Sequence, residues 1–173
     1  MKIIASKNKK NVLRFDPGEE VFGILKKFCA KNRIGGGFFL GIGACREAVI
    51  SYFDAKKNRY EDHLVKENLE IINFTCPPIA ISNFCIITWV LVLINGLWVN
   101  NVEGDGGRAG NIAVLDKEHI IHAHGSFGDR KLKVAAGHVK KLVVSATREL
   151  IVTDLGVSIA RRHSLETGLN LLV

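Results

Sequence analysis

The clearest periodic pattern of hydrophobic residues lies near the start of the chain. An apolar stripe recurs at the spacing of one face of an α-helix: Val21, Phe22, Leu25, Phe28 and Cys29. Just before it, Asp16 can cap a helix, Pro17 suits a first turn, and Glu19 stands at the capping-box position. The pattern therefore predicts one main N-terminal helix.

Most of the remaining chain alternates or clusters apolar residues in short runs, which is typical of β-strands. The predicted strands cover residues 12–15, 38–42, 47–54, 59–63, 69–74, 110–116, 119–127 and 142–155. We expect a bend at Gly41–Ala44, a hairpin turn at Lys56-Lys57-Asn58 and a break near Thr147. One helix against many strands predicts an α+β domain built on a mostly antiparallel sheet.

Composition narrows the class of protein without naming a function. The chain has 173 residues, 47% hydrophobic and 24% charged, which fits one globular domain. A net charge of +7 permits binding to nucleic acid or another polyanion, although scattered basic residues are also typical of a solvated surface. The four cysteines form no C-x-x-C pair and no signal peptide is evident, so we expect reduced thiols in a cytoplasmic protein.

Candidate chemistry is concentrated in one histidine-rich segment. Half of the six histidines are His122, His124 and His138. On a strand, His122 and His124 would share one face, about 7 Å apart, and a turn after Gly128 would bring His138 back toward them. Three neutral imidazoles with an open fourth position predict a zinc site. The alternative is that the three histidines bond to one another, to the backbone or to an anion.

Three other motifs carry no chemistry. Gly41-Ile42-Gly43 lacks the third glycine of a dinucleotide fingerprint, and Gly104-Asp105-Gly106-Gly107 lacks the following Gly-Lys-Ser/Thr of a phosphate loop. Gly125-Ser126-Phe127-Gly128 has the wrong spacing for a nucleophile elbow. We therefore expect turns at both glycine motifs and no nucleophilic role for Ser126.

Several pieces, taken in order, resemble the PPC (plants and prokaryotes conserved) domain. They are Leu13-Arg14-Phe15-Asp16-Pro17-Gly18-Glu19-Glu20, Gly41-Ile42-Gly43-Ala44, Tyr52-Phe53-Asp54, Gly110-Asn111-Ile112-Ala113, the histidine segment, and Glu166-Thr167-Gly168-Leu169-Asn170-Leu171. The resemblance implies a single domain over residues 1–173 with a strongly bent mixed sheet, assembling as a homotrimer. Prokaryotic members are commonly labelled DNA-binding, but the AT-hook that contacts DNA in plant relatives is absent from this sequence.

The same fold is similar to that of acetolactate decarboxylase, a zinc lyase that uses a His-x-His pair and a third histidine. His122, His124 and His138 match that pattern in kind. Where the family has Gly-Gly-His, this chain has Ala136-Gly137-His138, and the extra methyl group of Ala136 is expected to crowd the backbone.

One block does not fit the family pattern. No charged residue occurs from Ile71 through Val102, and joining residue 75 directly to Gly110 would restore the pattern, so residues 76–109 resemble an insertion. Residues 79–99 are apolar enough for a membrane helix, but the strands on either side must pair within one small domain, so we expect no membrane span. Three interpretations remain: an added β-hairpin, an excursion that contacts a membrane or partner, or a segment without selected structure.

Two functional hypotheses follow. The first is a regulatory, DNA-associated homotrimer that binds DNA through its basic surface and carries the histidine metal site. The alternative is a zinc-dependent lyase or hydrolase acting on a small oxyanionic substrate. In that case Arg46 or Arg130 would pair with a substrate carboxylate, and Glu47 or Glu149 would move a proton. We favour the non-catalytic role and leave catalysis open.

Overall fold

A computed structural model describes residues 1–72 and 110–173 of the chain. Its elements are β1 (Lys2–Lys7), β2 (Lys10–Phe15), α1 (Val21–Lys31), β3 (Gly37–Asp54), β4 (Arg59–Val65), β5 (Leu69–Ile71), β6 (Gly110–Leu115), β7 (Glu118–Gly128), β8 (Val134–Asp154), β9 (Arg161–His163) and β10 (Asn170–Leu172). The predicted insertion at residues 76–109 lies outside the described residues.

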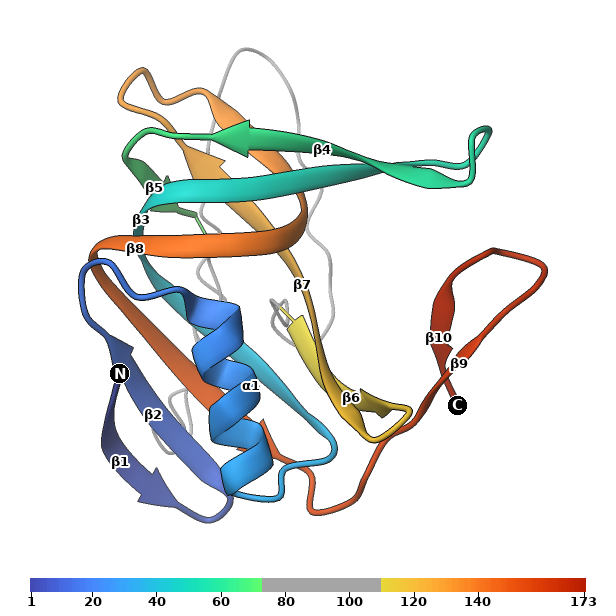
Figure 1. Ribbon diagram of the computed structural model, residues 1–173. Helices are drawn as coiled ribbons and strands as arrows, with labels where there is room; N and C mark the ends of the chain where they lie inside the picture. Colours follow the sequence, from blue (N-terminus) through green and yellow to red (C-terminus); the bar gives the residue numbers. More distant parts are fainter. Residues whose placement is uncertain (73–109) are drawn as a thin grey trace, which may run out of the picture.

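Two long strands organise the sheet. β3 and β8 pair antiparallel along most of their length, and β3 also pairs with β4, β5 and β6. The sheet order is β1-β2-β8-β3-β5-β7-β6, and β7 pairs additionally with β8, so the sheet wraps around on itself (Figure 1). All pairings between the described strands are antiparallel. A parallel contact occurs at an isolated bridge outside these pairings, from Val114 to Ala160. The predicted α+β class with a mostly antiparallel sheet is confirmed.

β3 and β8 bend through bulges instead of ending. Gly43 pairs with Arg148 and Cys45 with Val144, so β8 has extra residues at the place where a break was predicted near Thr147. A Cβ atom on Gly43 would lie 2.3 Å from the Thr147 carbonyl oxygen, and Gly43 has a φ of +140°. A bulge bends a strand while pairing continues on both sides. The prediction of separate strands at 38–42 and 47–54 is therefore wrong, because both belong to β3.

The helix begins later than the sequence pattern predicted. Glu20 is its N-cap, and the Glu20 carboxylate accepts hydrogen bonds from the Phe22 and Gly23 amides at 3.0 and 2.7 Å. Gly18 adopts a φ of +86°, a left-handed conformation that interrupts a helix. Asp16 and Pro17 thus belong to a turn before α1, and the prediction of Asp16 as the cap is wrong.

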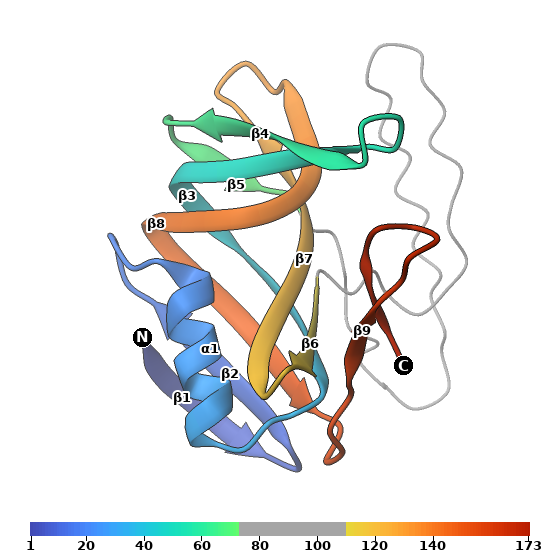
Figure 2. The same cartoon turned by 45° about the vertical axis from the view of Figure 1, so that its right-hand side comes forward.

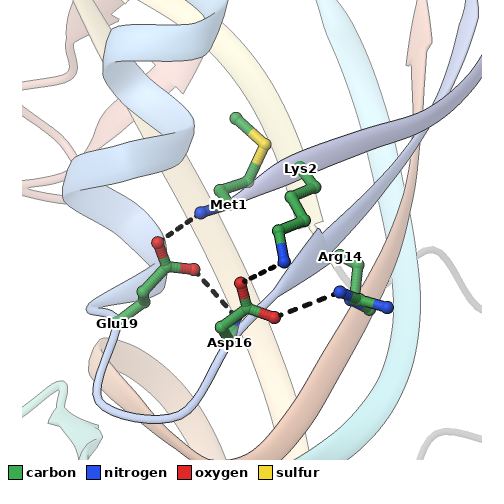
Figure 3. A network of polar contacts seen from close by, with 5 residues as sticks. All are labelled: Met1, Lys2, Arg14, Asp16 and Glu19. Carbon is green, nitrogen blue, oxygen red and sulfur yellow. Dashed lines mark hydrogen bonds and ion pairs between the residues drawn. The ribbon is translucent and has the colours of Figure 1, made fainter.

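The residues predicted as a capping box instead anchor that turn to the first two strands. The Asp16 amide donates to Glu19 Oε2 at 2.8 Å, and the Met1 amino group also contacts Glu19 (Figure 3). The Asp16 carboxylate lies 3.3 Å from Lys2 Nζ and 3.4 Å from an Arg14 guanidinium nitrogen. The hydrogen bond and charge of Lys2, with Arg14 nearby, lower the pKa of Asp16. This network ties β1 and β2 to the start of α1.

The predicted apolar stripe of α1 is confirmed as part of the core. Val21, Leu25, Phe28 and Cys29 are buried, and α1 packs on β7 and β8, which places the helix against the sheet in both views (Figures 1 and 2). Cys29 and Cys45 are free thiols, and burial raises their pKa values to about 12 and about 11. Both thiols are therefore unreactive core groups.

A C-terminal arm, defined here as residues 155–173, leaves the sheet after β8. It carries the β9–β10 hairpin, which the sequence pattern did not predict and which stands apart from the main sheet (Figure 1). The arm returns to β6, where the Val114 amide donates to the Ile159 carbonyl at 2.8 Å. Among the described residues, no helix is both long and apolar enough to cross a membrane.

Replacing the cap residue is expected to destabilise the fold. Glu20→Ala removes two hydrogen bonds to helix amides and is expected to lower the free energy of unfolding by about 1 kcal/mol. Urea denaturation of this variant checks the value. Glu67→Ala is the control, because Glu67 is exposed and has no hydrogen bond or ion pair within the described parts of the chain. Equal effects of the two substitutions would contradict the capping role.

Candidate metal centre

The pairing of β7 with β8 brings the three histidines together. His124 lies directly opposite His138 in this pair, and His122 lies two residues earlier on the same face of β7. The ring centroids are 5.2 Å apart for His122 and His124, 4.9 Å for His122 and His138, and 5.4 Å for His124 and His138. The predicted turn after Gly128 thus returns the chain so that His138 meets the other two.

The nitrogen atoms of this cluster are close to a metal-binding arrangement. One ring nitrogen of each histidine lies within 4.8 Å of the other two. Nitrogens bound to one zinc ion at about 2.0–2.1 Å would lie roughly 3.3 Å apart in tetrahedral geometry, so the rings must close in slightly to share an ion. His122 and His138 are half-buried, whereas His124 is exposed. The sheet therefore supports the cluster, and His124 is its most accessible member.

Burial and neighbouring charges lower the pKa values of His122 and His138 and so keep these two imidazoles neutral. Burial is the main cause that lowers the pKa of His138 to about 4, and the charges of His122, His124 and Lys140 lower it further. Burial and the Arg161 charge lower the pKa of His122. A neutral imidazole offers the lone pair that a metal ion needs. The protonation state of His122 and His138 is thus suited to metal binding at neutral pH.

The cluster passes a test of fit for a divalent metal. His138 Nδ1 is buried and has no hydrogen-bond partner among the described residues. Buried side-chain nitrogens nearly always have a partner, and a bound metal ion would provide one for this nitrogen. Three imidazoles are a donor set that suits zinc and other divalent transition metals.

Arg161 on β9 is a site residue that the sequence pattern did not predict. One guanidinium nitrogen, Nη2, lies 3.1 Å from His122 Nδ1 and donates to Asn111 Oδ1 at 2.8 Å; the other, Nη1, donates to the Asn170 carbonyl. A guanidinium only donates, so His122 Nδ1 accepts and the proton of neutral His122 stands on Nε2. No sequence motif marks Arg161, because it reaches the histidines through the unpredicted C-terminal arm.

Residues of β3 and β4 form a second layer beside His138. The Tyr60 ring centroid lies 4.9 Å from that of His138, and the Phe53 ring centroid lies 5.1 Å from that of Tyr60. Asp62 accepts hydrogen bonds from Lys140 Nζ at 2.7 Å and from the Ser51 hydroxyl at 2.8 Å, which lower the pKa of Asp62. This layer thus places the Tyr60 ring and the hydrogen-bonded carboxylate of Asp62 near His138.

The four residues considered for catalysis do not join this cluster. Glu47 forms an ion pair with Lys141, whose Nζ donates to Glu47 Oε1 at 2.7 Å. Glu149 lies opposite Ile42, toward the end of β8 that is far from His138. Arg130 lies in the exposed turn between β7 and β8, and the Arg46 guanidinium lies near Gly18.

The sequence led us to expect that Ala136 crowds the backbone, but it does not. It is exposed on β8 opposite Ser126. The tight position is the next one, Gly137, where a Cβ atom would lie 2.9 Å from the Ser51 carbonyl oxygen. The glycine that this stretch needs is therefore present.

Comparison with known proteins identifies the family resemblance. Residues 4–77 match the family profile of the Plants and Prokaryotes Conserved domain. The resemblance to the PPC domain is confirmed. The match ends before the histidine segment, so it says nothing about the histidines. No curated protein matches the chain.

Solved structures of similar fold support the same assignment. A PPC protein of Pyrococcus horikoshii has 23% identity and a TM-score of 0.69, covering 97% of this chain and 93% of that one. A "putative dna binding protein" of Bacteroides thetaiotaomicron has 22% identity and a TM-score of 0.74, covering 98% and 94%. A metal-containing protein of Archaeoglobus fulgidus has 22% identity and a TM-score of 0.69, covering 100% and 99%. At these identities the likeness establishes the fold.

The histidine pKa values predict a pH-dependent stability for the metal-free protein. The pKa of the His138 side chain is 6.5 in the unfolded chain and is lowered to about 4 in the folded protein. The unfolded state therefore binds more protons between these values, and stability is full above pH 6.5 and falls as the pH drops toward 4. Urea denaturation with a chelator present, repeated across this window, measures the slope.

The substitution His138→Gln is expected to flatten that slope. His63→Gln is the control, because His63 is exposed on β4 and lies outside the cluster. An unchanged slope in His138→Gln would show that another group carries the pH dependence.

Proposed function

We propose that this protein is a DNA-associated regulatory protein of the PPC fold that assembles as a homotrimer and binds one zinc ion per chain. The observation that carries the metal site is the convergence of His122, His124 and His138, with their ligand atoms within 4.8 Å of one another. The metal content of the Archaeoglobus protein, as its name states, supports the same proposal. The bound ion would supply a positive charge and an open coordination position.

Metal content tests this site directly. Protein purified without a histidine tag is expected to contain about one zinc ion per chain, and His124→Ala is expected to lose it because one of three ligands is gone. His119→Ala is the matched control, since His119 lies on the opposite face of the same strand. Zinc that is absent from the wild type, or retained equally in all three proteins, would contradict the site.

The homotrimer rests on the family resemblance and on exposed apolar groups. Leu165, Val157 and Val173 of the C-terminal arm are 95%, 61% and 64% exposed in the isolated chain. Apolar side chains exposed to this degree favour burial in an assembly. Three chains of 19.0 kDa give a mass of about 57 kDa, which sedimentation of the wild type and the metal-site variants would measure.

A basic end of the molecule supports the association with DNA. Lys7, Lys9 and Lys10 surround the turn between β1 and β2, and Lys26, Lys27, Lys31 and Arg33 lie on and just after the C-terminal half of α1. The turn and the end of the helix lie at the same end of the molecule (Figure 1). All seven residues are exposed, and none has an ion pair with another described residue. Unpaired basic groups gathered on one surface favour contact with phosphates.

Salt-dependent binding to duplex DNA tests the basic end. Replacing Lys7, Lys9 and Lys10 with glutamine is expected to weaken binding and to reduce the slope of log K against log salt by about 3 for each bound chain. The matched control replaces Arg130, Lys131 and Lys133, which carry the same charge in the turn between β7 and β8. Equal losses in the two triple variants, or binding without salt dependence, would contradict a DNA surface at this end.

A second candidate function is a zinc-dependent lyase or hydrolase acting on a small oxyanionic substrate. The position of Arg161 beside His122 favours it, because a guanidinium is the usual partner of a carboxylate. Tyr60 and Asp62 lie near His138 and would replace Glu47 and Glu149 as the groups that hold or move a proton. Turnover of small keto or hydroxy acids by the zinc-loaded protein would favour this function over the regulatory one.

A further inference from the structure

Within residues 1–72 and 110–173, the Arg161 guanidinium has no negatively charged partner. Its partners are the Asn111 amide oxygen, the Asn170 carbonyl and His122 Nδ1, all of which are neutral. Its Nε atom is buried and has no partner among the described residues. A partly buried guanidinium with uncharged partners and an orphaned N–H has capacity for an anion.

The acidic group that lies near His138, Asp62, does not meet that need. Asp62 is bound to Lys140 Nζ at 2.7 Å and to the Ser51 hydroxyl at 2.8 Å. No ion pair joins Arg161 to a carboxylate within residues 1–72 and 110–173. Among these residues, no carboxylate thus compensates the positive charge of Arg161 beside His122.

Metal binding would remove one of the present partners of Arg161. If His122 binds the ion through Nδ1, the lone pair that now accepts from Arg161 is used. If His122 binds through Nε2, its neutral ring carries the proton on Nδ1, and a metal-bound histidine needs an acceptor there. Arg161 has no acceptor, so in both cases the contact between the two side chains is lost.

We propose that Arg161 is the anion-recognition residue of this site, and that it binds the carboxylate of a small organic acid when the histidines hold a metal. This inference rests on the proposed metal site and adds the class of ligand that the site takes. A carboxylate offers two oxygens in the plane of the guanidinium fork, which satisfies the orphaned Nε and the nitrogen released by His122. Metal and carboxylate then bind with positive coupling, each raising the affinity for the other.

Cobalt-loaded protein provides the test, because the visible spectrum of Co²⁺ reports changes at the site. Titration of the cobalt-loaded wild type with acetate is expected to give a saturable spectral change. Arg161→Gln keeps a hydrogen-bonding side chain but removes the charge, and it is expected to weaken acetate binding at least tenfold, about 1.4 kcal/mol. Arg161→Lys keeps the charge without the fork and is expected to lie between the two.

Arg162→Gln is the matched control, because Arg162 is the exposed neighbour on β9 and points to the other face of the strand. It is expected to bind acetate as the wild type does. A second readout is cobalt affinity, measured by competition with a chelator. Acetate is expected to raise this affinity in the wild type and in Arg162→Gln, but not in Arg161→Gln.

The outcomes separate this inference from the proposed metal site. Cobalt binding with equal acetate affinity in the wild type and Arg161→Gln would overturn the role of Arg161 and leave the metal site standing. Failure of the wild type to bind cobalt would overturn the metal site and the anion site together. Normal cobalt binding by Arg161→Gln also shows that this variant is folded at the site.

Discussion

The register between β7 and β8 is the constraint on which the candidate site depends. It places His124 opposite His138, and the two-residue period of a strand then puts His122 on the same face. A shift of one residue would turn His138 to the other face of the sheet, so the site requires this register. The register is held on the other side of β8 by its long pairing with β3, in which Ser51 lies opposite His138. The core strands thus position the chemistry.

The C-terminal arm adds the cationic part of the site. Its backbone is fixed to β6 by the hydrogen bond from Val114 to Ile159, and Arg161 follows two residues later. From there the guanidinium reaches both Asn111 on β6 and His122 on β7. Metal affinity, anion affinity and docking of the arm are consequently linked, because all three depend on what Arg161 contacts.

Local patterns predicted the parts of the fold that local interactions determine. The apolar stripe of α1, the hairpin turn at residues 56–58 and the strand around His122 and His124 were all visible in the sequence. The histidine cluster followed because its spacing matches the period of a strand.

The start of α1 was misplaced because the positive φ of Gly18 depends on the turn that joins β2 to the helix. The continuity of β3 through Gly43 was missed because a bulge and a chain break share the same glycine-rich signature. Arg161 was missed because only tertiary packing of the arm brings it to His122.

The chain has two separate regions for ligands. One is the metal centre on the sheet, together with Arg161 of the C-terminal arm. The other is the basic surface at the turn of the β1–β2 hairpin. The metal centre is the claim on which the site, the anion inference and the second candidate function all rest. Anomalous diffraction at the zinc edge from zinc-loaded crystals tests it most directly. The account predicts one peak per chain, about 2.0–2.1 Å from a nitrogen of each of His122, His124 and His138. A peak elsewhere, or no peak between these three side chains, would contradict it.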